Sequence, residues 1–424
     1  MLATGVFLLF SFTVATSQPK TWGFNYDRTS TGPSSVGGVD VTLKELFDVL
    51  GPAAALSKLS SDFQAMHALN GTSVRLFVNL PDLVLPPPYA ASAPINATFL
   101  ALLVSACDAA GGAGLTVDLT GSTFERQDME GMDAWRAASD EDLLSARAAF
   151  WAAAAAALKG HPWVRNFNLV NEPFVVWDDF LHEVVTGCIP VVRPNNATST
   201  FCYLHPVFRH ATLQWTRAMH ALFPTPSMLA AHWKDYPLPG ETFNALAIPA
   251  PSATDSCRRK DYTSFLFNKT SEWCSTLAGA IRAADPARLV TVGIQFGSTM
   301  PDTLTAQACK DSLDFFSVHL YPRGDFPTPA ALQQYFVGRL DLLPAGTSKA
   351  VTWEEFYPMG QAQNISMQEI PGILLRASSS IRAPLRVQSH FSFYWGTADS
   401  LDMSPISAAI YNQWLQLWAA ARPF

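Results

Sequence analysis

The chain has 424 residues, of which 49% are hydrophobic and only 15% are charged. This apolar fraction excludes an intrinsically disordered protein, and the length allows one very large domain or two to three ordinary ones. The net charge is −7 and no run of Lys or Arg stands out. A nucleic-acid groove needs a basic stripe, so the sequence argues against a nucleic-acid partner.

The first 17 residues have the character of a secretory signal peptide. Leu2 to Val14 is largely apolar, and Ala15, Thr16 and Ser17 offer small residues where a signal peptidase cuts. The segment lacks a positively charged start, so an uncleaved anchor or a buried helix is the alternative. It is shorter than the about 20 apolar residues of a transmembrane span. We therefore expect residues 1–17 to be removed, leaving a secreted protein without a membrane anchor.

N-glycosylation sequons also favour secretion. Five N-x-S/T sequons occur, and none has proline in the middle; they begin at Asn70, Asn96, Asn196, Asn268 and Asn364.

The six cysteines include no C-x-x-C pair, which fits disulfides better than zinc or a redox motif. Bridging of nearest neighbours predicts Cys188–Cys202 and Cys257–Cys274, and leaves Cys107 with Cys309. Buried free thiols are the alternative for some of these cysteines.

Short apolar runs alternate with helical stretches, which indicates an α/β fold with parallel strands. The expected strands are Thr21–Tyr26, Ser73–Asn79, Leu115–Leu119, Val164–Val170, Leu289–Ile294, Phe315–Leu320, Ala350–Trp353 and Gln388–Tyr394. The expected helices include Pro52–Leu69, Glu141–Lys159, Ser271–Ala284 and Ile406–Ala421. Eight β/α units are the count of a (β/α)8 TIM barrel, and an open doubly wound sheet is the competing fold.

Residues 174–288 depart from the alternation of strands and helices, because they separate two predicted strands by far more residues than a βα connection needs. The interval carries four of the six cysteines and two of the sequons. We expect a single barrel domain over residues 18–424, with a disulfide-stapled insertion after the fourth strand.

Carboxylates stand at the carboxyl ends of two predicted strands. Asn171-Glu172-Pro173 follows the fourth strand, and Glu354-Glu355-Phe356 follows the seventh. Barrel active sites lie at these strand ends. Two facing carboxyl groups suit glycoside hydrolysis, in which one donates a proton and the other attacks the anomeric carbon. A separation of about 5.5 Å between the two carboxyl groups would imply retention of the anomeric configuration, and a wider separation would imply inversion.

Asn-Glu-Pro after an apolar strand, with Glu-Phe after a later one, resembles glycoside hydrolase clan A, and most closely family 5. That family includes cellulases and β-mannanases. The resemblance implies a retaining enzyme that needs no metal or organic cofactor. It implies that Glu172 is the general acid/base and that Glu355 is the nucleophile.

The same resemblance implies supporting roles for five further residues. It implies that Arg75 supports the nucleophile, that Asn171 binds the sugar 2-hydroxyl, that His319 shapes the subsite, that Tyr321 hydrogen-bonds the nucleophile and that Trp395 forms the floor under the −1 sugar. The sequence departs from the family pattern at Tyr357, where the family often has Gly, and in its longer insertion.

Each site residue also has a plain structural interpretation. Glu172 could favour a helix N-terminus, Arg75 could pair with a surface acid, and His319 or Trp395 could be ordinary core residues. Glu354 and Glu355 are adjacent, so strand alternation predicts that only one points inward, and the family match favours Glu355. Three aromatic residues of the insertion could line subsites or pack in a core or lid: Trp177, Trp233 and Tyr236.

The sequence therefore predicts a secreted, monomeric, retaining β-glycoside hydrolase that acts on β-linked polysaccharide or oligosaccharide. β-1,4-Mannan is the favoured substrate, with an endo-β-1,4-glucanase or an exo-acting β-glucosidase or β-mannosidase as alternatives. A non-catalytic carbohydrate-binding barrel is the rival from another class, and a metal-dependent hydrolase is a weaker one.

Overall fold

The computed structural model describes residues 21–26, 43–78, 92, 94–121, 124–126, 138–173, 188–192, 198–203, 211–249, 256–295, 300–320, 326–356, 365, 369–379, 386–392 and 416. The predicted signal peptide and nearly all of the predicted closing helix, Ile406–Ala421, lie outside these residues.

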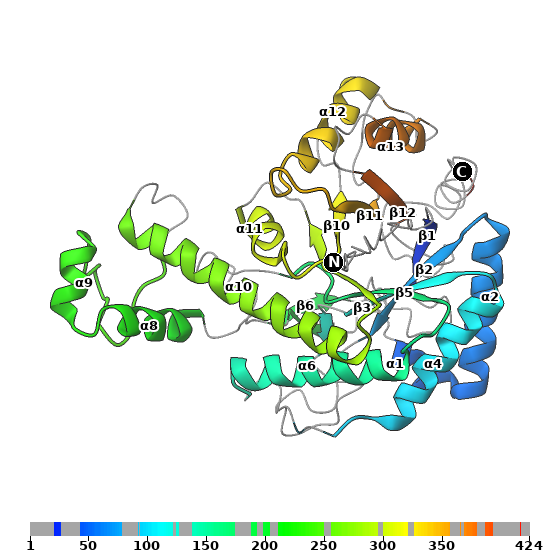
Figure 1. The fold of residues 1–424 in the computed structure, drawn as a ribbon, viewed down its shortest axis with the longest axis horizontal. Coiled ribbons are helices and arrows are strands. Elements are labelled where there is room, and N and C mark those ends of the chain that lie inside the picture. The colour runs from blue at the N-terminus through cyan, green and yellow to red at the C-terminus, as the bar shows by residue number, and fades with distance from the viewer. Residues whose placement is uncertain are drawn as a thin grey trace, which may run out of the picture.

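A barrel of parallel strands forms the centre of the molecule (Figure 1). Its sheet has nine strand segments in the order β8-β5-β3-β2-β1-β12-β11-β10-β9. They are β1 (Thr21–Tyr26), β2 (Ser73–Val78), β3 (Thr116–Gly121), β5 (Val164–Asn168), β8 (Leu289–Thr291), β9 (Gly293–Gln295), β10 (Phe315–Leu320), β11 (Ala350–Phe356) and β12 (Arg386–Ser392).

The sheet closes on itself through the pair β8 and β9. Only Val292 separates these two segments, so they are halves of one strand, and the nine segments make eight strands. The first half pairs with β5 and the second with β10, while β1 pairs with β12. This closure confirms the (β/α)8 barrel and excludes the open doubly wound sheet. All eight predicted strands are present, but β11 extends beyond the predicted Trp353 and includes Glu354 and Glu355.

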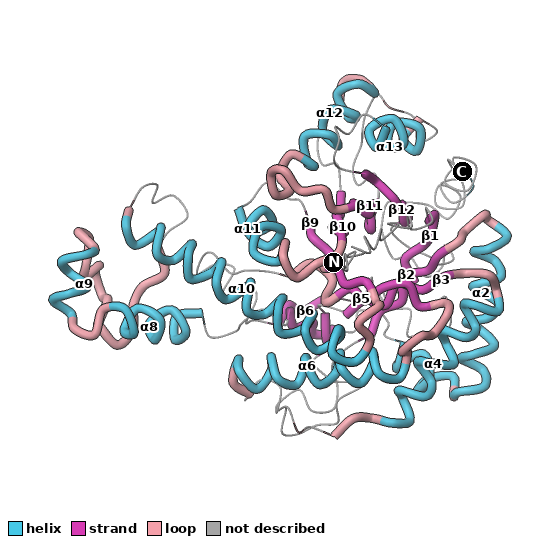
Figure 2. The backbone as a smooth tube through the Cα atoms, viewed as in Figure 1, coloured by secondary structure: helices cyan, strands magenta, loops and turns pink. Residues whose placement is uncertain are grey.

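Helices cover the outside of the barrel (Figures 1 and 2). They are α1 (Leu43–Leu50), α2 (Pro52–Ala68), α4 (Ala97–Gly112), α6 (Asp140–Ala157), α10 (Cys257–Ala284), α11 (Met300–Cys309), α12 (Pro329–Leu340) and α13 (Ile370–Ser379). Side-chain oxygens of Asn96, Ser139, Ser256 and Thr328 accept backbone N–H groups where α4, α6, α10 and α12 begin. Within the described part of the chain, no helix is both long and apolar enough to cross a bilayer.

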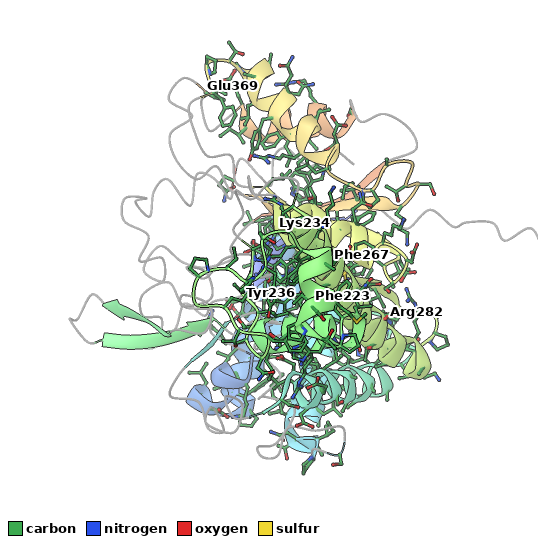
Figure 3. The ribbon with its side chains drawn as sticks, turned by 90° about the vertical axis from the view of Figure 1, so that its left-hand side faces the viewer. Phe223, Lys234, Tyr236, Phe267, Arg282 and Glu369 are labelled. Atoms are coloured by element: carbon green, nitrogen blue, oxygen red, sulfur yellow. A yellow bond between two sulfur atoms is a disulfide. The ribbon has the colours of Figure 1, made fainter. Side chains whose placement is uncertain are left out.

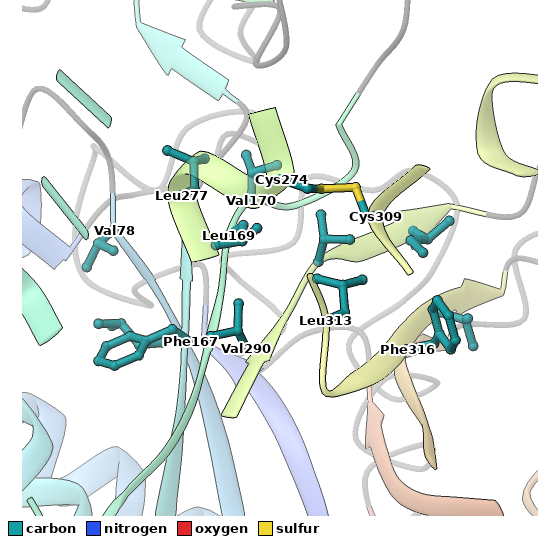
Figure 4. Packing of buried hydrophobic residues seen from close by; sticks show 14 of the residues in the cluster. Val78, Phe167, Leu169, Val170, Cys274, Leu277, Val290, Cys309, Leu313 and Phe316 are labelled. Carbon is teal, nitrogen blue, oxygen red and sulfur yellow. A yellow bond between two sulfur atoms is a disulfide. The ribbon is translucent and has the colours of Figure 1, made fainter. Parts of the chain in front are cut away.

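The main core lies between the barrel strands and these helices. Figure 4 shows Phe167 of β5 beside Val290 of β8, and Leu277 of α10 on the side of Leu169, all of them buried. Successive side chains of a strand point to opposite faces, so the neighbours of these apolar residues point into the barrel. That interior is polar: Asn25, Arg75, Asp118, Asn168, Ser317, His319 and Glu354 are all buried.

Part of the 174–288 interval extends the barrel at the carboxyl ends of its strands. The strands β6 (Cys188–Val192) and β7 (Thr198–Tyr203) are antiparallel, and β7 also pairs with β4 (Phe124–Arg126). These strands lie in the connections that follow the carboxyl ends of β3 and β5. The small sheet therefore belongs to the end of the barrel where those strands finish.

The rest of the interval forms a helical lobe. The helices α8 (Ala211–Leu222) and α9 (Pro226–His232) lie at the outer end of α10, away from the barrel (Figure 1). Figure 3 looks onto that outer end, where Phe223, Tyr236 and Phe267 are labelled. Trp233 is fully buried and stacks on Trp215 with ring centroids 5.4 Å apart. Trp233 thus packs inside the lobe, and Tyr236 packs edge-on against it.

A disulfide joins Cys274 of α10 to Cys309 of α11 (Figure 4). The predicted pairs Cys257–Cys274 and Cys107–Cys309 are therefore wrong. Cys274 lies 17 positions after Cys257 on one helix, and the rise of an α-helix sets them about 25 Å apart. Cys107 is a buried free thiol, and Cys257 is exposed and free.

The third predicted pair, Cys188–Cys202, lies on the small sheet. The register of β6 and β7 places Cys188 directly opposite Cys202. Their side chains lie outside the described part of the structure, so this pair stays a prediction.

Candidate active site

Two carboxylates face each other at the carboxyl ends of the barrel strands. Glu172 follows β5, and Glu355 lies near the end of β11. Their carboxylate oxygens and an imidazole nitrogen of His319 all lie within 4.8 Å of one another. Their side chains are 11% and 6% exposed, so both reach the surface of the site. So close an approach of one oxygen from each group favours the spacing of retaining glycosidases, about 5–5.5 Å, over the about 6.5–9.5 Å of inverting ones.

Arg75 of β2 connects the two sides of the site. Its Nη1 donates to Oε1 of Glu355 at 2.5 Å, and its Nη2 donates to Oδ1 of Asn171 at 2.8 Å. Its Nε donates to Thr120 at 2.9 Å. Burial lowers the pKa of Arg75, but the charges of Glu354 and Glu355 outweigh burial and raise it above its usual value. Arg75 is therefore a fixed internal cation, not a surface ion-pair partner.

Asn25 of β1 supports the same arginine. Its Oδ1 accepts from Nη1 of Arg75 at 3.1 Å, and its Nδ2 donates to the main-chain oxygen of Glu354 at 3.0 Å. Asn25 thereby links the first strand to the seventh inside the barrel.

The backbone of Glu172 is in the left-handed region, with φ 46°. Such a conformation is costly for a residue other than glycine and persists where the surroundings enforce it. Here the N–H of Glu172 donates to the carbonyl of Gly293 at 3.0 Å, and the N–H of Asn171 donates to that of Gly121 at 2.7 Å. These bonds to neighbouring strands on both sides fix the direction in which Glu172 enters the site.

His319 of β10 lies between two carboxylates. Its Nδ1 is 2.7 Å from Oε1 of Glu172, and its Nε2 is 3.0 Å from Oε2 of Glu354. Nε2 faces the carboxylate of Glu354, which accepts hydrogen bonds, so this nitrogen carries a proton, while Nδ1 faces a carboxyl oxygen of Glu172. Burial lowers the pKa of His319, but the charge of Glu355 and the hydrogen bonds to Glu172 and Glu354 raise it to about 9.

Glu172 is the group of this cluster that is set to carry a proton. Burial raises its pKa, and so does the negative charge of Glu355, while the hydrogen bond from His319 acts in the opposite direction. Three carboxylates (Glu172, Glu354 and Glu355) face two cations (Arg75 and His319). Among these three carboxylates, Glu172 is the one whose pKa is raised, whereas that of Glu354 is held below its usual value.

Glu354 and Glu355 both point into the barrel, which corrects the expectation that only one would. In the register with β10, Trp353 pairs with Val318 and Glu355 with His319. Glu354 is the extra residue of a β-bulge, and a bulge interrupts the alternation of side chains.

Three sequence-distant groups hold the carboxylate of Glu354. Asn168 donates to Oε1 at 2.7 Å, His319 contacts Oε2 at 3.0 Å, and Arg75 lies 3.1 Å from Oε2. Burial raises the pKa of Glu354, but Arg75 and His319 outweigh burial and hold it below its usual value. Glu354 is therefore a buried carboxylate anion.

Gly293 makes room for this arrangement. A Cβ at Gly293 would lie 2.8 Å from Nε2 of His319 and 3.0 Å from Oε2 of Glu354. Sequence reasoning missed Glu354, Asn168 and Gly293 as site residues. Their proximity depends on strand register, which no motif in the chain reveals.

The structure thus brings together Arg75, Asn171, Glu172, His319 and Glu355 from the predicted site. Tyr321 and Trp395 lie outside the described residues.

Three groups of the cluster, on Glu172, His319 and Glu355, have the spacing of a cation site. A metal needs a lone pair on the imidazole, and both nitrogens of His319 instead face carboxylates as donors. The contacts of His319 with Glu172 and Glu354 suit the sharing of protons between these groups.

No family model and no curated protein match the sequence. Solved structures do match the fold. A glycoside hydrolase of family 5, subfamily 18, from Streptomyces cattleya in complex with GlcNAc has a TM-score of 0.54 at 13% identity, covering 95% of this chain and 80% of that one. The chain therefore has the (β/α)8 barrel fold of these structures.

Two further structures have the same fold. The subfamily 18 enzyme from Bifidobacterium longum has a TM-score of 0.54 at 11% identity, covering 95% of this chain and 78% of that one. A β-galactosidase from the psychrophilic Marinomonas ef1 has a TM-score of 0.56 at 13% identity, covering 94% of this chain. This chain spans 59% of the length of that galactosidase.

Proposed function

We propose that this protein is a β-glycoside hydrolase that works by double displacement with retention of configuration. The observation that carries the proposal is the close approach of Glu172 and Glu355, whose carboxylate oxygens lie within 4.8 Å of each other at the mouth of the barrel. That spacing leaves room for a sugar carbon between the two groups but not for an additional water.

In the first step, protonated Glu172 donates its proton to the glycosidic oxygen while a carboxylate oxygen of Glu355 attacks the anomeric carbon. The bond from that carbon to the leaving oxygen breaks, and the departing alcohol keeps the proton. Arg75 pairs with the charge of Glu355 and fixes its orientation before the attack. The product of this step is a glycosyl ester on Glu355.

In the second step, ionised Glu172 accepts a proton from water as the water oxygen attacks the anomeric carbon. The ester bond breaks, and Glu355 regains its charge. Glu172 can take this second role because esterification removes the neighbouring negative charge that raises its pKa. The nearby His319 imidazolium then stabilises its ionised form.

Hydrolysis of aryl β-glycosides, followed by ¹H NMR of the first-formed sugar, tests the proposal. We expect the β-anomer to appear first and to mutarotate slowly to the mixture. Initial release of the α-anomer would contradict double displacement. Sugar binding with no turnover of any β-glycoside would favour the non-catalytic carbohydrate-binding barrel.

For the substrate, we propose a β-1,4-mannan, with β-1,4-glucan and the exo-acting alternatives as competitors. The Glu354-Glu355-Phe356 string and the elaborated loop regions support a mannan. The Streptomyces cattleya enzyme has been solved with Manβ1-4GlcNAc, at a TM-score of 0.52 and 14% identity, and this disaccharide is a useful member of the test panel. The panel should also contain soluble mannan, soluble β-1,4-glucan and the corresponding aryl monosides. Faster turnover of glucan than of mannan would overturn the choice.

We further propose that the protein acts outside the cell as a monomer. The Cys274–Cys309 disulfide supports an oxidising compartment, and the sequon residues Asn70 and Asn268 are exposed. Amino-terminal sequencing of protein from the culture medium should begin near Gln18. Light scattering after gel filtration should give the mass of one chain. Retention of residues 1–17 or a dimer mass would contradict these proposals.

A further inference from the structure

Glu354 makes no bond to substrate in the reaction described above, yet it is fully buried at the centre of the site. Its Oε2 lies 3.0 Å from Nε2 of His319, and the opposite nitrogen of that ring lies 2.7 Å from Glu172. The three groups form a continuous chain of charged hydrogen bonds from the barrel interior to the proton donor.

We propose that Glu354 is a positioning residue, whose carboxylate holds the His319 ring so that Nδ1–H is directed at the acid/base Glu172. The inference rests on the proposed function, because it explains how that function's proton donor is placed. A buried carboxylate that orients a histidine toward a reacting group is a general device of acid–base catalysis. Glu354 reaches this position only because the bulge in β11 turns it inward beside Glu355.

The surroundings leave Glu354 little freedom. Asn168 donates its Nδ2 to Oε1 of Glu354 and accepts the N–H of Gly293 on its Oδ1 at 2.9 Å. A Cβ on Gly293 would intrude between His319 and Glu354. The side-chain amide of Asn168 and the absence of a side chain at Gly293 therefore set the contact between Glu354 and the His319 ring.

Several charged groups face His319 and decide its protonation. Glu354 and Glu355 approach from β11 and Glu172 from the end of β5. Arg75 of β2 binds both Glu354 and Glu355 from the other side. Asp118 of β3 interacts with Glu354 and Arg75, and burial raises its pKa to about 7. Removing the charge of Glu354 leaves the shape of this network but weakens the field that keeps the His319 ring protonated.

The test is Glu354→Gln, which keeps an oxygen for Nε2–H and removes the charge. NMR of the imidazole nitrogens in the free protein gives the pKa of His319, and His319→Gln assigns its signal among the nine histidines. We expect the pKa of His319 to fall by about one unit or more. The basic limb of the kcat/KM profile should also shift, because His319 contributes to the pKa of Glu172. A residue that is only structural would lower kcat/KM without moving that limb.

A double-mutant cycle separates two routes by which Glu354 could act. If it acts through His319, then adding Glu354→Gln to His319→Gln should change kcat/KM by less than about twofold. An undiminished effect in that background would mean that Glu354 acts through Arg75, and the inference would be overturned. Glu241→Gln is the matched control, since Glu241 is a buried carboxylate paired with Arg258 in the distant lobe. It should leave the pH profile unchanged.

Gly293→Ala tests the same contact without removing either partner. Its methyl group should push Glu354 and His319 apart, and we expect a lower pKa of His319 and the same shift of the basic limb as for Glu354→Gln. If both variants leave the pKa of His319 and the basic limb where they are, the inference is wrong. Lack of hydrolysis by the wild-type protein would defeat the proposed function instead, and the NMR titration would still decide whether Glu354 controls His319.

Discussion

Arg75 and Glu355 are 280 residues apart in the sequence, and Nη1 of the first lies 2.5 Å from Oε1 of the second. The same guanidinium binds Asn171 and Thr120. One buried arginine therefore fixes the predicted nucleophile and the predicted ligand of the sugar 2-hydroxyl in a single frame.

Arg75→Lys should lower kcat/KM by about 100-fold or more. An ammonium group cannot reproduce the fork that reaches Glu355, Asn171 and Thr120 together. Initial rates on an aryl β-glycoside measure the effect, and thermal unfolding checks the fold. A change of less than about threefold would mean that the arginine does not orient the nucleophile.

Glu355→Gln should reduce turnover by at least about 1,000-fold, because the amide cannot form the glycosyl ester. The fold should persist, since the amide oxygen can still accept from Arg75. Circular dichroism and steady-state hydrolysis provide the two measurements. Near-normal hydrolysis by this variant would contradict the assignment of Glu355 as the nucleophile.

Glu172→Gln should affect the two steps unequally. A substrate with a good leaving group needs no proton donor, so the glycosyl ester should form and accumulate, while its hydrolysis loses its general base. We expect a burst of phenol followed by slow turnover, and azide should restore turnover by giving the β-glycosyl azide. Azide that instead yields the α-azide, or no rescue at all, would contradict the role of Glu172.

Stability should also depend on pH through His319. Its pKa is raised from about 6.5 in an unfolded chain to about 9 in the fold. A raised folded-state pKa contributes stability that is fully present below about 6.5 and lost as the pH rises through about 9. Chemical denaturation at pH 6 and pH 9.5 should show lower stability at the higher pH. The difference should shrink in His319→Gln, and an unchanged difference would assign it to other groups.

Loss of the disulfide should destabilise the protein by about 4 kcal/mol on chain-entropy grounds, because the bridge closes a separation of 35 residues. Paired Cys274→Ser and Cys309→Ser substitutions should therefore lower the unfolding midpoint while leaving the site intact. Cys257→Ser is the control, since that thiol is exposed and free. Equal midpoints for the two variants would argue that the bridge does not stabilise the native state.

The strands and part of the site could be predicted from sequence because their signals are local. Apolar runs such as Phe315–Leu320 indicate buried strands by themselves, and the residues after Val170 stand out as polar groups at a strand end. Barrel topology then brings strand ends together, which is why Arg75, Glu172 and Glu355 meet.

The remaining features depend on contacts between distant segments. The bulge that turns Glu354 inward is a register shift between β10 and β11, and the two residues that shape its pocket, Asn168 and Gly293, lie on other strands. The disulfide failed to follow nearest-neighbour pairing because α10 extends far beyond its predicted start and separates Cys257 from Cys274. Neither register nor helix length is encoded in a short motif.

The barrel closes where β8 and β9 meet, and Glu172, the proposed acid/base, lies at the same place. The N–H of Leu169 donates to Thr291, the N–H of Gly293 donates to Val170, and the N–H of Glu172 donates to Gly293. Closing the ring of strands and aiming the proton donor thus depend on one row of main-chain bonds. A molecule that begins to open along this seam loses the alignment of Glu172 while its outer helices are still folded. A substitution that weakens these main-chain bonds should therefore lower turnover before it unfolds the helices.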